Sequence, residues 1–346
     1  MNEYKKLALS VKLQPLAIFF AQRGRMRTIN CYSQSFPLHT PFVIARGVRS
    51  EARVVVVEMT ENGLSASGEC TPYPRYGESE QSVLDQIQSV IPALEQGMSR
   101  EQLQTLLPAG AARNALDSAL WSLEAAKAGI SLASLLAVRL PSQLYTAQTV
   151  SIGSPEQMAT AAVRLWEKGA LLLKIKLDNQ QVNERITAIR SAVPDATLIV
   201  DANESWEPEG LEQRCQRLAE LKVAMLEQPL PAHQDEALAL FAHPLPICAD
   251  ESCHTRASLN SLVGRYEMVN IKLDKTGGLT EALLLASAAR EQGFEIMVGC
   301  MLCSSRAINA VLPLAVSARF ADLDGPTWLS EDVQPGLAFA CGSLSF

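Results

Sequence analysis

Residues 171–178 read LLLKIKLD, an apolar run that contains two lysines separated by one residue. Alternate side chains of a β-strand point to the same side, so Lys174 and Lys176 would place two ammonium groups on one side of this segment. Burying a lysine is costly unless the lysine is paired or its pKa falls. The segment alone fits an edge strand with a charged, solvent-exposed side equally well. The rest of the sequence favours a buried strand.

The second half of the chain alternates short apolar runs with helical segments. A polar residue near the end of each of eight runs recurs at intervals of 22 to 28 residues: Thr149, Lys174, Asp201, Glu227, Asp250, Lys272, Cys300 and Asp322. A strand, a helix and two short loops need about that length, so eight such units predict a parallel β/α barrel. A doubly wound open sheet is the competing topology, but no GxGxxG sequence opens a βα unit.

The residues before this repeat have a different pattern. Residues 53–58 are rich in valine, and Asn62-Gly63 supplies the turn of a β-hairpin. Residues 78–138 then switch to helical periodicity. Strands followed by helices predict an α+β domain of about 115 residues.

The first 25 residues contain two early lysines and an apolar middle, which faintly resembles a secretory signal. Lys12, Gln14 and Pro15 interrupt the apolar part, and no small-x-small cleavage site follows Ala21. The segment is also too short and too polar to span a bilayer. We therefore expect residues 1–25 to be a weakly ordered extension of a soluble, cytoplasmic protein.

Composition narrows the range of partners. The net charge of −7 argues against nucleic acid, because phosphate contacts need clustered Lys and Arg. The eight cysteines form no dense framework, so reduced thiols are expected. The CxxC sequence at 300–303 lacks a second CxxC or a nearby His pair, which disfavours a zinc or redox site.

Three successive strands of the predicted barrel end in carboxylates, Asp201, Glu227 and Asp250. Barrel strands carry active-site residues at their C-terminal ends, so these anions would lie close together and repel unless a cation joins them. Hard oxygen ligands suit Mg²⁺ best. One such Asp could instead cap a helix, but three in matching positions make capping alone a poor explanation. The sequence therefore predicts a Mg²⁺ site.

Lysines flank this predicted metal site. Lys174 and Lys176 precede it, and Lys272 ends a strand on the opposite side of the barrel mouth. Burial and a nearby cation should lower the lysine pKa from about 10.4. One lysine could remove the α-proton of a metal-bound carboxylate, and the other could return a proton to the opposite face of the enediolate. This predicts racemisation or epimerisation. A Schiff-base lysine is the main functional alternative, and it does not explain three carboxylates.

Five sequence segments carry a family resemblance: KIK at 174–176, DANESW at 201–206, EQPLP at 227–231, ADES at 249–252 and NIKLDKTGGLTEAL at 270–283. Together they resemble the muconate-lactonizing subgroup of the enolase superfamily, where Lys or His bases paired with Mg²⁺ are an established pattern. The resemblance covers residues 26–346.

The resemblance implies a fold and a domain division. The fold is a modified (β/α)8 TIM barrel, (β/α)7β, with an N-terminal α+β capping domain. The barrel would span 141–324, and the capping domain would span 26–140 and be completed by the C-terminal segment 325–346.

The resemblance also implies site residues. Their roles would be as follows: Lys176 and Lys272 form the acid/base pair, Asp201, Glu227 and Asp250 bind Mg²⁺, and Lys174 and Thr149 contact the substrate. Asp322-Leu323-Asp324 resembles the DxD motif of dipeptide epimerases and would bind the free α-ammonium of a dipeptide. A turn is the alternative role for Asp324. Dipeptides of the Ala-Glu type, handled in murein peptide recycling, are the implied substrates.

A glutamate side chain in the substrate would require a cation. Arg46 and Arg49, in a loop expected at 39–50, are candidates, and solvation at the surface is the alternative for both. Residues 71–79 are expected to form a second capping loop. Residues 300–303 are expected to line the pocket around the first side chain of the substrate.

Two other functions remain to be compared. An o-succinylbenzoate synthase or a cycloisomerase would use the same metal and lysines, but its substrate has no ammonium for the DxD motif. A catalytically inactive binding protein would lack a ligand or a lysine, and none is missing here. The expected partner is a small dipeptide, without nucleic acid or membrane, and homo-oligomerisation is left open.

Overall fold

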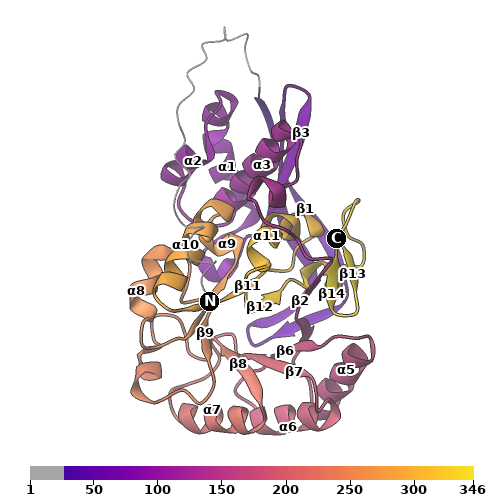
Figure 1. The fold of residues 1–346 in the computed structure, drawn as a ribbon, viewed down its shortest axis with the longest axis vertical. Helices are drawn as coiled ribbons and strands as arrows, with labels where there is room; N and C mark the ends of the chain where they lie inside the picture. Colours follow the sequence, from indigo (N-terminus) through magenta and orange to yellow (C-terminus); the bar gives the residue numbers. More distant parts are fainter. Residues whose placement is uncertain (1–26) are drawn as a thin grey trace.

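The computed structural model describes residues 27–346, so the extension expected at 1–25 lies outside the described residues. Figure 1 shows a helical and antiparallel β region at one end of the molecule, with a barrel and its surrounding helices below it. A long β-hairpin runs from the first region along the side of the barrel.

The N-terminal region is α+β, as predicted. Its sheet is an antiparallel meander of β1 (Arg27–Ile44), β2 (Gly47–Glu61) and β3 (Leu64–Cys70). Asn62 and Gly63, both with positive φ, form the tight turn between β2 and β3. The helical elements that follow are η1 (Pro74–Tyr76), α1 (Glu80–Glu95), α2 (Arg100–Leu106), α3 (Ala111–Ala128) and α4 (Leu132–Leu135).

The prediction of a loop at 39–50 is wrong. This segment is the tip of the β1–β2 hairpin, in which Phe42 pairs with Arg49 and Ile44 pairs with Gly47. The register is irregular only between Pro37 and Phe42, where proline cannot donate a ladder hydrogen bond. The run Phe-Val-Ile at 42–44 favours strand structure, and that preference prevails over the polar residues beside it.

Helix α3 packs so closely on β3 that residue 68 has no room for a side chain. A Cβ at Gly68 would lie 2.1 Å from the Ala115 carbonyl oxygen and 2.7 Å from the Ala119 nitrogen. We expect Gly68→Ala to lower the free energy of unfolding by roughly 1–3 kcal/mol, because two backbones would have to separate. Urea unfolding measures this. Ser67→Ala is the control, and an equal effect of the two substitutions would contradict the explanation.

The barrel is confirmed. Eight parallel strands lie side by side in sequence order: β5 (Gln148–Val150), β6 (Leu172–Lys176), β7 (Thr197–Asp201), β8 (Val223–Glu227), β9 (Ile247–Ala249), β10 (Met268–Ile271), β11 (Glu295–Gly299) and β12 (Phe320–Asp322). The Ala147 N–H donates to the Ala321 carbonyl at 2.8 Å and joins the two ends of the sheet. This sequential order excludes a doubly wound sheet.

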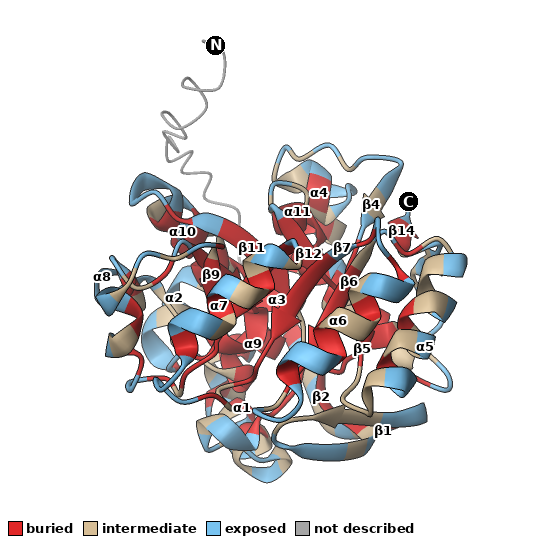
Figure 2. Ribbon diagram, turned by 90° about the horizontal axis from the view of Figure 1, so that it is seen from below, coloured by how far each residue is buried: buried red, intermediate tan, exposed pale blue. Residues whose placement is uncertain are grey.

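Helical segments connect these strands on the outside (Figures 1 and 2): α5 (Pro155–Glu167), α6 (Val182–Ala192), α7 (Leu211–Glu220), η2 (Glu236–Leu240), η3 (Arg256–Ser258), α8 (Leu259–Leu262), α9 (Leu273–Thr276), α10 (Leu279–Glu291) and α11 (Ser305–Ala315). The last strand, β12, leads only into the short η4 (Gly325–Trp328). This agrees with the expected (β/α)7β pattern.

Residues 172–176 of the segment LLLKIKLD form β6, which is paired with β5 on one side and β7 on the other. The edge-strand interpretation is therefore wrong. Leu173 and Ile175 pack in the layer between strands and helices, while Leu172 on the opposite side packs against the barrel interior. Lys174 shares the side of Leu172 and is 1% exposed. Buried residues accordingly dominate the barrel strands in Figure 2.

The C-terminal segment contacts two parts of the molecule. Leu329 bridges to Leu38 of the capping sheet, and the Ser330 N–H donates to the Pro37 carbonyl at 2.8 Å. Further on, β13 (Ala338–Ala340) and β14 (Ser343–Ser345) form a small sheet with β4 (Gln143–Tyr145), which leads into β5. The division at 140 and 324 stays a prediction. Within residues 27–346, none of the helices has the length and apolar character that crossing a membrane requires.

Candidate active site

A cavity lies at the C-terminal ends of the barrel strands. The capping region covers it with the hairpin tip, residues 42–49, and the segment 71–76, which we together call the roof. The roof contributes Phe42, Ile44, Arg46, Arg49 and Tyr73 to the lining. The barrel contributes Thr149, Lys174, Lys176, Asn203, Lys272, Cys300, Met301, Leu302, Asp322, Asp324 and Gly325. Six residues predicted for catalysis or substrate binding thus share one cavity.

The strand register brings the predicted carboxylates and lysines together. Lys176 pairs with Asp201 between β6 and β7, and Asp201 pairs with Glu227 between β7 and β8. Asp250 directly follows β9. Asp201 and Glu227 are 0% exposed and Asp250 is 1% exposed, so these three carboxylates depend on the cations around them.

Lys174 is the central cation of this group. Its Nζ lies 3.0 Å from Asp201 Oδ2, 2.7 Å from Glu227 Oε2 and 2.7 Å from Asp322 Oδ2. Burial lowers the pKa of Lys174, but the carboxylates around it outweigh burial and hold that pKa well above its ordinary value. Lys174 therefore stays charged and suits a role as a fixed cation rather than a base.

The two predicted bases contact different carboxylates. Lys176 Nζ donates to Asp201 Oδ2 at 2.6 Å and to Asn203 Oδ1 at 3.3 Å. Lys272 Nζ donates to Asp250 Oδ2 at 2.7 Å. Burial lowers the pKa of Lys272, but Asp250, Glu227 and Glu251 together outweigh burial, so the net shift is upward. The lowered pKa that the sequence predicted is therefore not found for Lys272 with these contacts.

The pKa values of the three carboxylates are shifted in different directions. The pKa of Asp201 is lowered, because Lys174 and Lys176 outweigh the effect of burial. The pKa of Asp250 is likewise well below its usual range, where Lys272 and Lys275 outweigh burial. Burial raises the pKa of Glu227 to about 7, and the neighbouring Asp201 adds to the shift.

The donor chemistry of this group fits Mg²⁺. Three buried carboxylates supply hard oxygen atoms, and Glu227 Oε2 accepts no hydrogen bond although Lys174 lies 2.7 Å away. In the part of the chain that the structure describes, no group of three or more Asp, Glu, His or Cys side chains is arranged so that it could hold a metal ion. The lysine ammonium groups contact the carboxylates instead. Asp201, Glu227 and Asp250 as Mg²⁺ ligands therefore stay a prediction.

Sequence reasoning missed two residues that hold these carboxylates. Lys275 Nζ donates to Asp250 Oδ1 at 2.6 Å, to the Asp250 carbonyl at 2.5 Å and to the Asn270 carbonyl at 2.8 Å. The Asn270 side chain donates to Glu227 Oε1 at 2.7 Å. Both residues lie in the NIKLDKTGG segment around Lys272, so a second lysine three residues later was the available signal.

The DxD pair lines the cavity on the side of β12. Asp322 Oδ2 contacts Lys174, whereas Asp322 Oδ1 is buried without a hydrogen-bond partner. Asp324 Oδ2 accepts from the Thr149 N–H at 2.8 Å and from the Trp328 side chain at 3.3 Å. Burial raises the pKa of Asp324 to about 6, and Asp322 adds to the shift. Asp324 also precedes η4, so the predicted turn and the cavity lining coexist.

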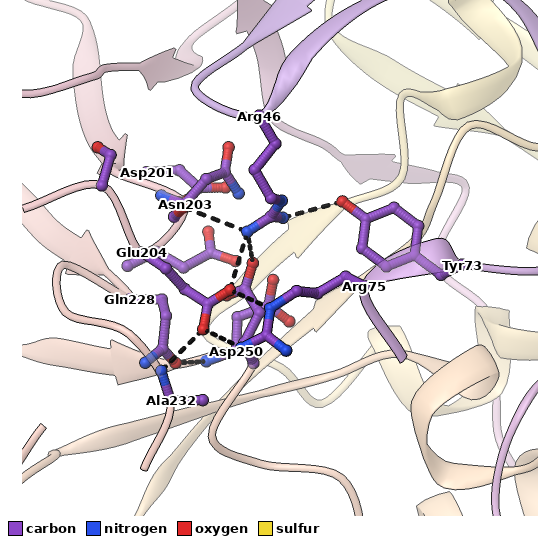
Figure 3. A network of polar contacts seen from close by, with 12 residues as sticks. Arg46, Tyr73, Arg75, Asp201, Asn203, Glu204, Gln228, Ala232 and Asp250 are labelled. Carbon is purple, nitrogen blue, oxygen red and sulfur yellow. Dashed lines mark hydrogen bonds and ion pairs between the residues drawn. The ribbon is translucent and has the colours of Figure 1, made fainter. Parts of the chain in front are cut away.

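The two candidate arginines have different surroundings. Figure 3 shows those of Arg46. Arg46 donates to Tyr73 Oη at 2.9 Å, and its Nη1 lies 3.1 Å from Glu204 Oε2 and 2.7 Å from Glu251 Oε1. Arg49 lies over the Tyr73 ring at 5.2 Å and forms no ion pair with another described residue. Arg49 is thus the arginine of the cavity lining whose charge is not already matched.

The CxxC segment lies where the sequence placed it, at the end of β11. Cys300, Met301 and Leu302 line the cavity, whereas Cys303 is buried. All eight cysteines are free thiols. The expected loop at 71–79 contains the short helix η1 and contributes Tyr73 to the cavity.

Comparison with known proteins identifies both parts of the chain. Residues 26–137 match the N-terminal domain of the mandelate racemase/muconate lactonizing enzyme family. Residues 157–340 match the enolase C-terminal domain-like family.

Individual relatives agree with these matches. The chain is 67% identical to L-Ala-D/L-Glu epimerase of Escherichia coli K12, over 92% of this chain and 99% of that protein. It is 43% identical to N-acetyl-D-glutamate racemase of a Pseudoalteromonas species, over 84% of this chain and 92% of that protein. The structure of dipeptide epimerase from Enterococcus faecalis V583, complexed with Mg and L-Leu-L-Tyr, superposes with a TM-score of 0.86. It is 30% identical and covers 93% of this chain and 97% of its own.

These relatives are epimerases and a racemase, which confirms the prediction of an isomerase. The barrel and its N-terminal capping region match the fold that the resemblance implied. The chain belongs to the mandelate racemase/muconate lactonizing enzyme family of the enolase superfamily.

Proposed function

We propose that this protein is a Mg²⁺-dependent epimerase that inverts the C-terminal residue of L-Ala-L/D-Glu-type dipeptides. The observation that carries the proposal is the placement of Lys176 and Lys272. They end β6 and follow β10, four strands apart in an eight-stranded barrel, and both line the cavity. A substrate carbon between them would face an amine from each side, as 1,1-proton transfer requires.

Each lysine has one task in this reaction. The neutral lysine takes the α-proton from one face, and the protonated lysine on the opposite side delivers a proton to the other face. Lys272 can act as a base only after its ammonium separates from Asp250, because that contact raises its pKa. Mg²⁺ held by Asp201, Glu227 and Asp250 would supply positive charge against the charge that develops on the substrate carboxylate.

The DxD pair supports a dipeptide as substrate. Asp322 Oδ1 is buried without a partner, and Asp324 has a pKa raised by burial, so a cation placed between the two would stabilise both. The free α-ammonium of a dipeptide supplies such a cation, whereas N-acetylglutamate and the substrates of o-succinylbenzoate synthase or cycloisomerases do not. Lys174 and Thr149 would hold the substrate from the adjoining strands.

The experiment that tests this function is incubation with L-Ala-L-Glu and Mg²⁺ in D₂O. We expect deuterium at the α-carbon of glutamate and formation of L-Ala-D-Glu, and much slower reaction of N-acetyl-L-glutamate. Absence of both deuterium uptake and D-Glu would contradict the epimerase. Faster reaction of N-acetyl-L-glutamate would contradict the role of the DxD pair.

For the glutamate side chain of the substrate, Arg49 is our choice over Arg46. We expect Arg49→Met to lower kcat/KM for L-Ala-L-Glu by about 10- to 100-fold, since a charge-assisted hydrogen bond contributes about 1.5–3 kcal/mol. L-Ala-L-Leu should lose less than about threefold, because it has no distal carboxylate. Steady-state kinetics with both dipeptides measure the difference. Arg53→Met, an exposed arginine outside the cavity, is the control, and equal losses for both dipeptides would exclude Arg49 from this role.

The biological setting that we propose is murein peptide recycling in the bacterial cytoplasm. The E. coli relative supports this because its name specifies Ala-Glu dipeptides, and the family resemblance implies that substrates of this type belong to murein peptide recycling. Eight free cysteines fit a reducing compartment.

A further inference from the structure

The loop after β7 has an uncommon backbone conformation. Asn203 and Glu204 are consecutive non-glycine residues with positive φ, 46° and 65°. Side chains other than that of Gly rarely adopt this region, and it persists where the surroundings hold it. Here the Glu204 N–H donates to the Gln228 carbonyl at 2.9 Å. The strained backbone lies directly beside Asp201 and turns Glu204 toward the roof (Figure 3).

The Glu204 carboxylate is nearly buried, and both of its oxygens accept hydrogen bonds. Arg75 donates to both of its oxygens at 2.7 Å, and the Ala232 N–H donates to Oε1 at 2.7 Å. Arg46 donates to Oε2 at 3.1 Å. The side chain of Glu204 is 7% exposed. Two guanidinium groups therefore converge on one barrel carboxylate.

The two arginines come from the two halves of the roof. Arg46 lies at the turn of the β1–β2 hairpin, and Arg75 lies in η1. The same halves carry Arg49 and Tyr73, which line the cavity. Glu204 thus ties both covering segments to the barrel. We call Glu204, Arg46 and Arg75 the latch.

The hydrogen bonds of Lys176 are made to barrel residues, while the roof reaches this region through the Phe42 ring, 6.0 Å from Lys176 Nζ, and through Arg46, which donates to the Asn203 carbonyl at 3.2 Å. Asn203 accepts from Lys176 through Oδ1, and the Asn203 N–H donates to Asp201 Oδ1 at 2.9 Å. Loss of the latch would leave the hydrogen bonds of Lys176 to Asp201 and Asn203 in place, because the side chains of Glu204, Arg46 and Arg75 take no part in them. It would change how firmly the roof covers the substrate.

We propose that Glu204 is a positioning residue that holds the roof closed over the substrate through the latch. This inference rests on the proposed function only where its test uses the kinetics of L-Ala-L-Glu epimerisation. The Arg75 side chain is 39% exposed, so solvent weakens what its ion pair with the nearly buried Glu204 contributes to stability. An effect on cavity access separates the latch from a contact that only adds stability.

The test compares Glu204→Gln and Arg75→Met with the wild-type protein. The first measurement is alkylation of Cys300, which lines the cavity under the roof, by iodoacetamide, followed by peptide mass spectrometry. We expect alkylation about tenfold faster in both variants, since the closed fraction falls. This measurement needs no substrate, so it stands if the protein proves not to be an epimerase.

The second measurement is kinetic. We expect KM for L-Ala-L-Glu to rise about tenfold in both variants with kcat changed less than about threefold, because only the competent fraction falls. The double variant should match either single one. Glu51→Gln, whose partner Arg53 belongs to the same hairpin, is the matched control and should behave as wild type. Unchanged alkylation and KM in Arg75→Met, or a fall in kcat alone, would overturn the proposal even if Glu204→Gln fails to fold.

Discussion

We expect replacement of Lys176 or Lys272 by alanine to abolish epimerisation and to leave the barrel folded. General acid–base groups typically contribute 10²–10⁴-fold, so we expect kcat to fall at least about 10³-fold in each variant. Folding should survive because neither carboxylate is left without a cation. Asp201 keeps its contact with Lys174, and Asp250 keeps its contact with Lys275.

Deuterium exchange separates the two bases. Each single variant retains the base on one face, so it should exchange the α-proton of only one of L-Ala-L-Glu and L-Ala-D-Glu. NMR in D₂O follows both substrates. Lys168→Ala, an exposed lysine directly after α5, is the control for general effects of charge. Full turnover by either catalytic variant would refute the two-base mechanism.

Removing divalent metal with EDTA is expected to stop turnover completely, and Mg²⁺ is expected to restore it. The substrate carboxylate would otherwise have to carry its developing charge without the cation that this chemistry requires. The protein should remain folded after EDTA treatment, because Lys174 and Lys272 already compensate the three carboxylates.

Glu227→Gln tests the ligand assignment directly. Mg²⁺ at 100 times its Kd stabilises a protein that binds it by about 2.7 kcal/mol, so the Tm of the wild type should rise measurably. The variant should show little rise and no turnover. Glu220→Gln, an exposed acid on α7, should respond as the wild type does. A wild-type Tm response in Glu227→Gln would remove this residue from the metal site.

The interval between strand-end residues predicted the barrel correctly, because each βα unit consumes a nearly constant length of chain. The same interval placed Asp201, Glu227 and Asp250 on adjacent strands and Lys272 opposite Lys176. The β-branched and aromatic run at 42–44 could have predicted the hairpin tip, but the flanking polar residues obscured it. The roles of the ligand and base residues remain predictions that the experiments above address.

The sequence by itself determined which chemistry-bearing residues end the barrel strands, since local periodicity and strand register follow from spacing along the chain. Only the tertiary structure decided which charged side chains contact each other in the site. It placed Lys275 and Asn270 behind the carboxylates, matched Arg46 with Glu204 and Glu251, and left Arg49 facing the cavity. These contacts join residues from separate strands and from the two regions of the fold. Their distances depend on packing, which no local pattern encodes.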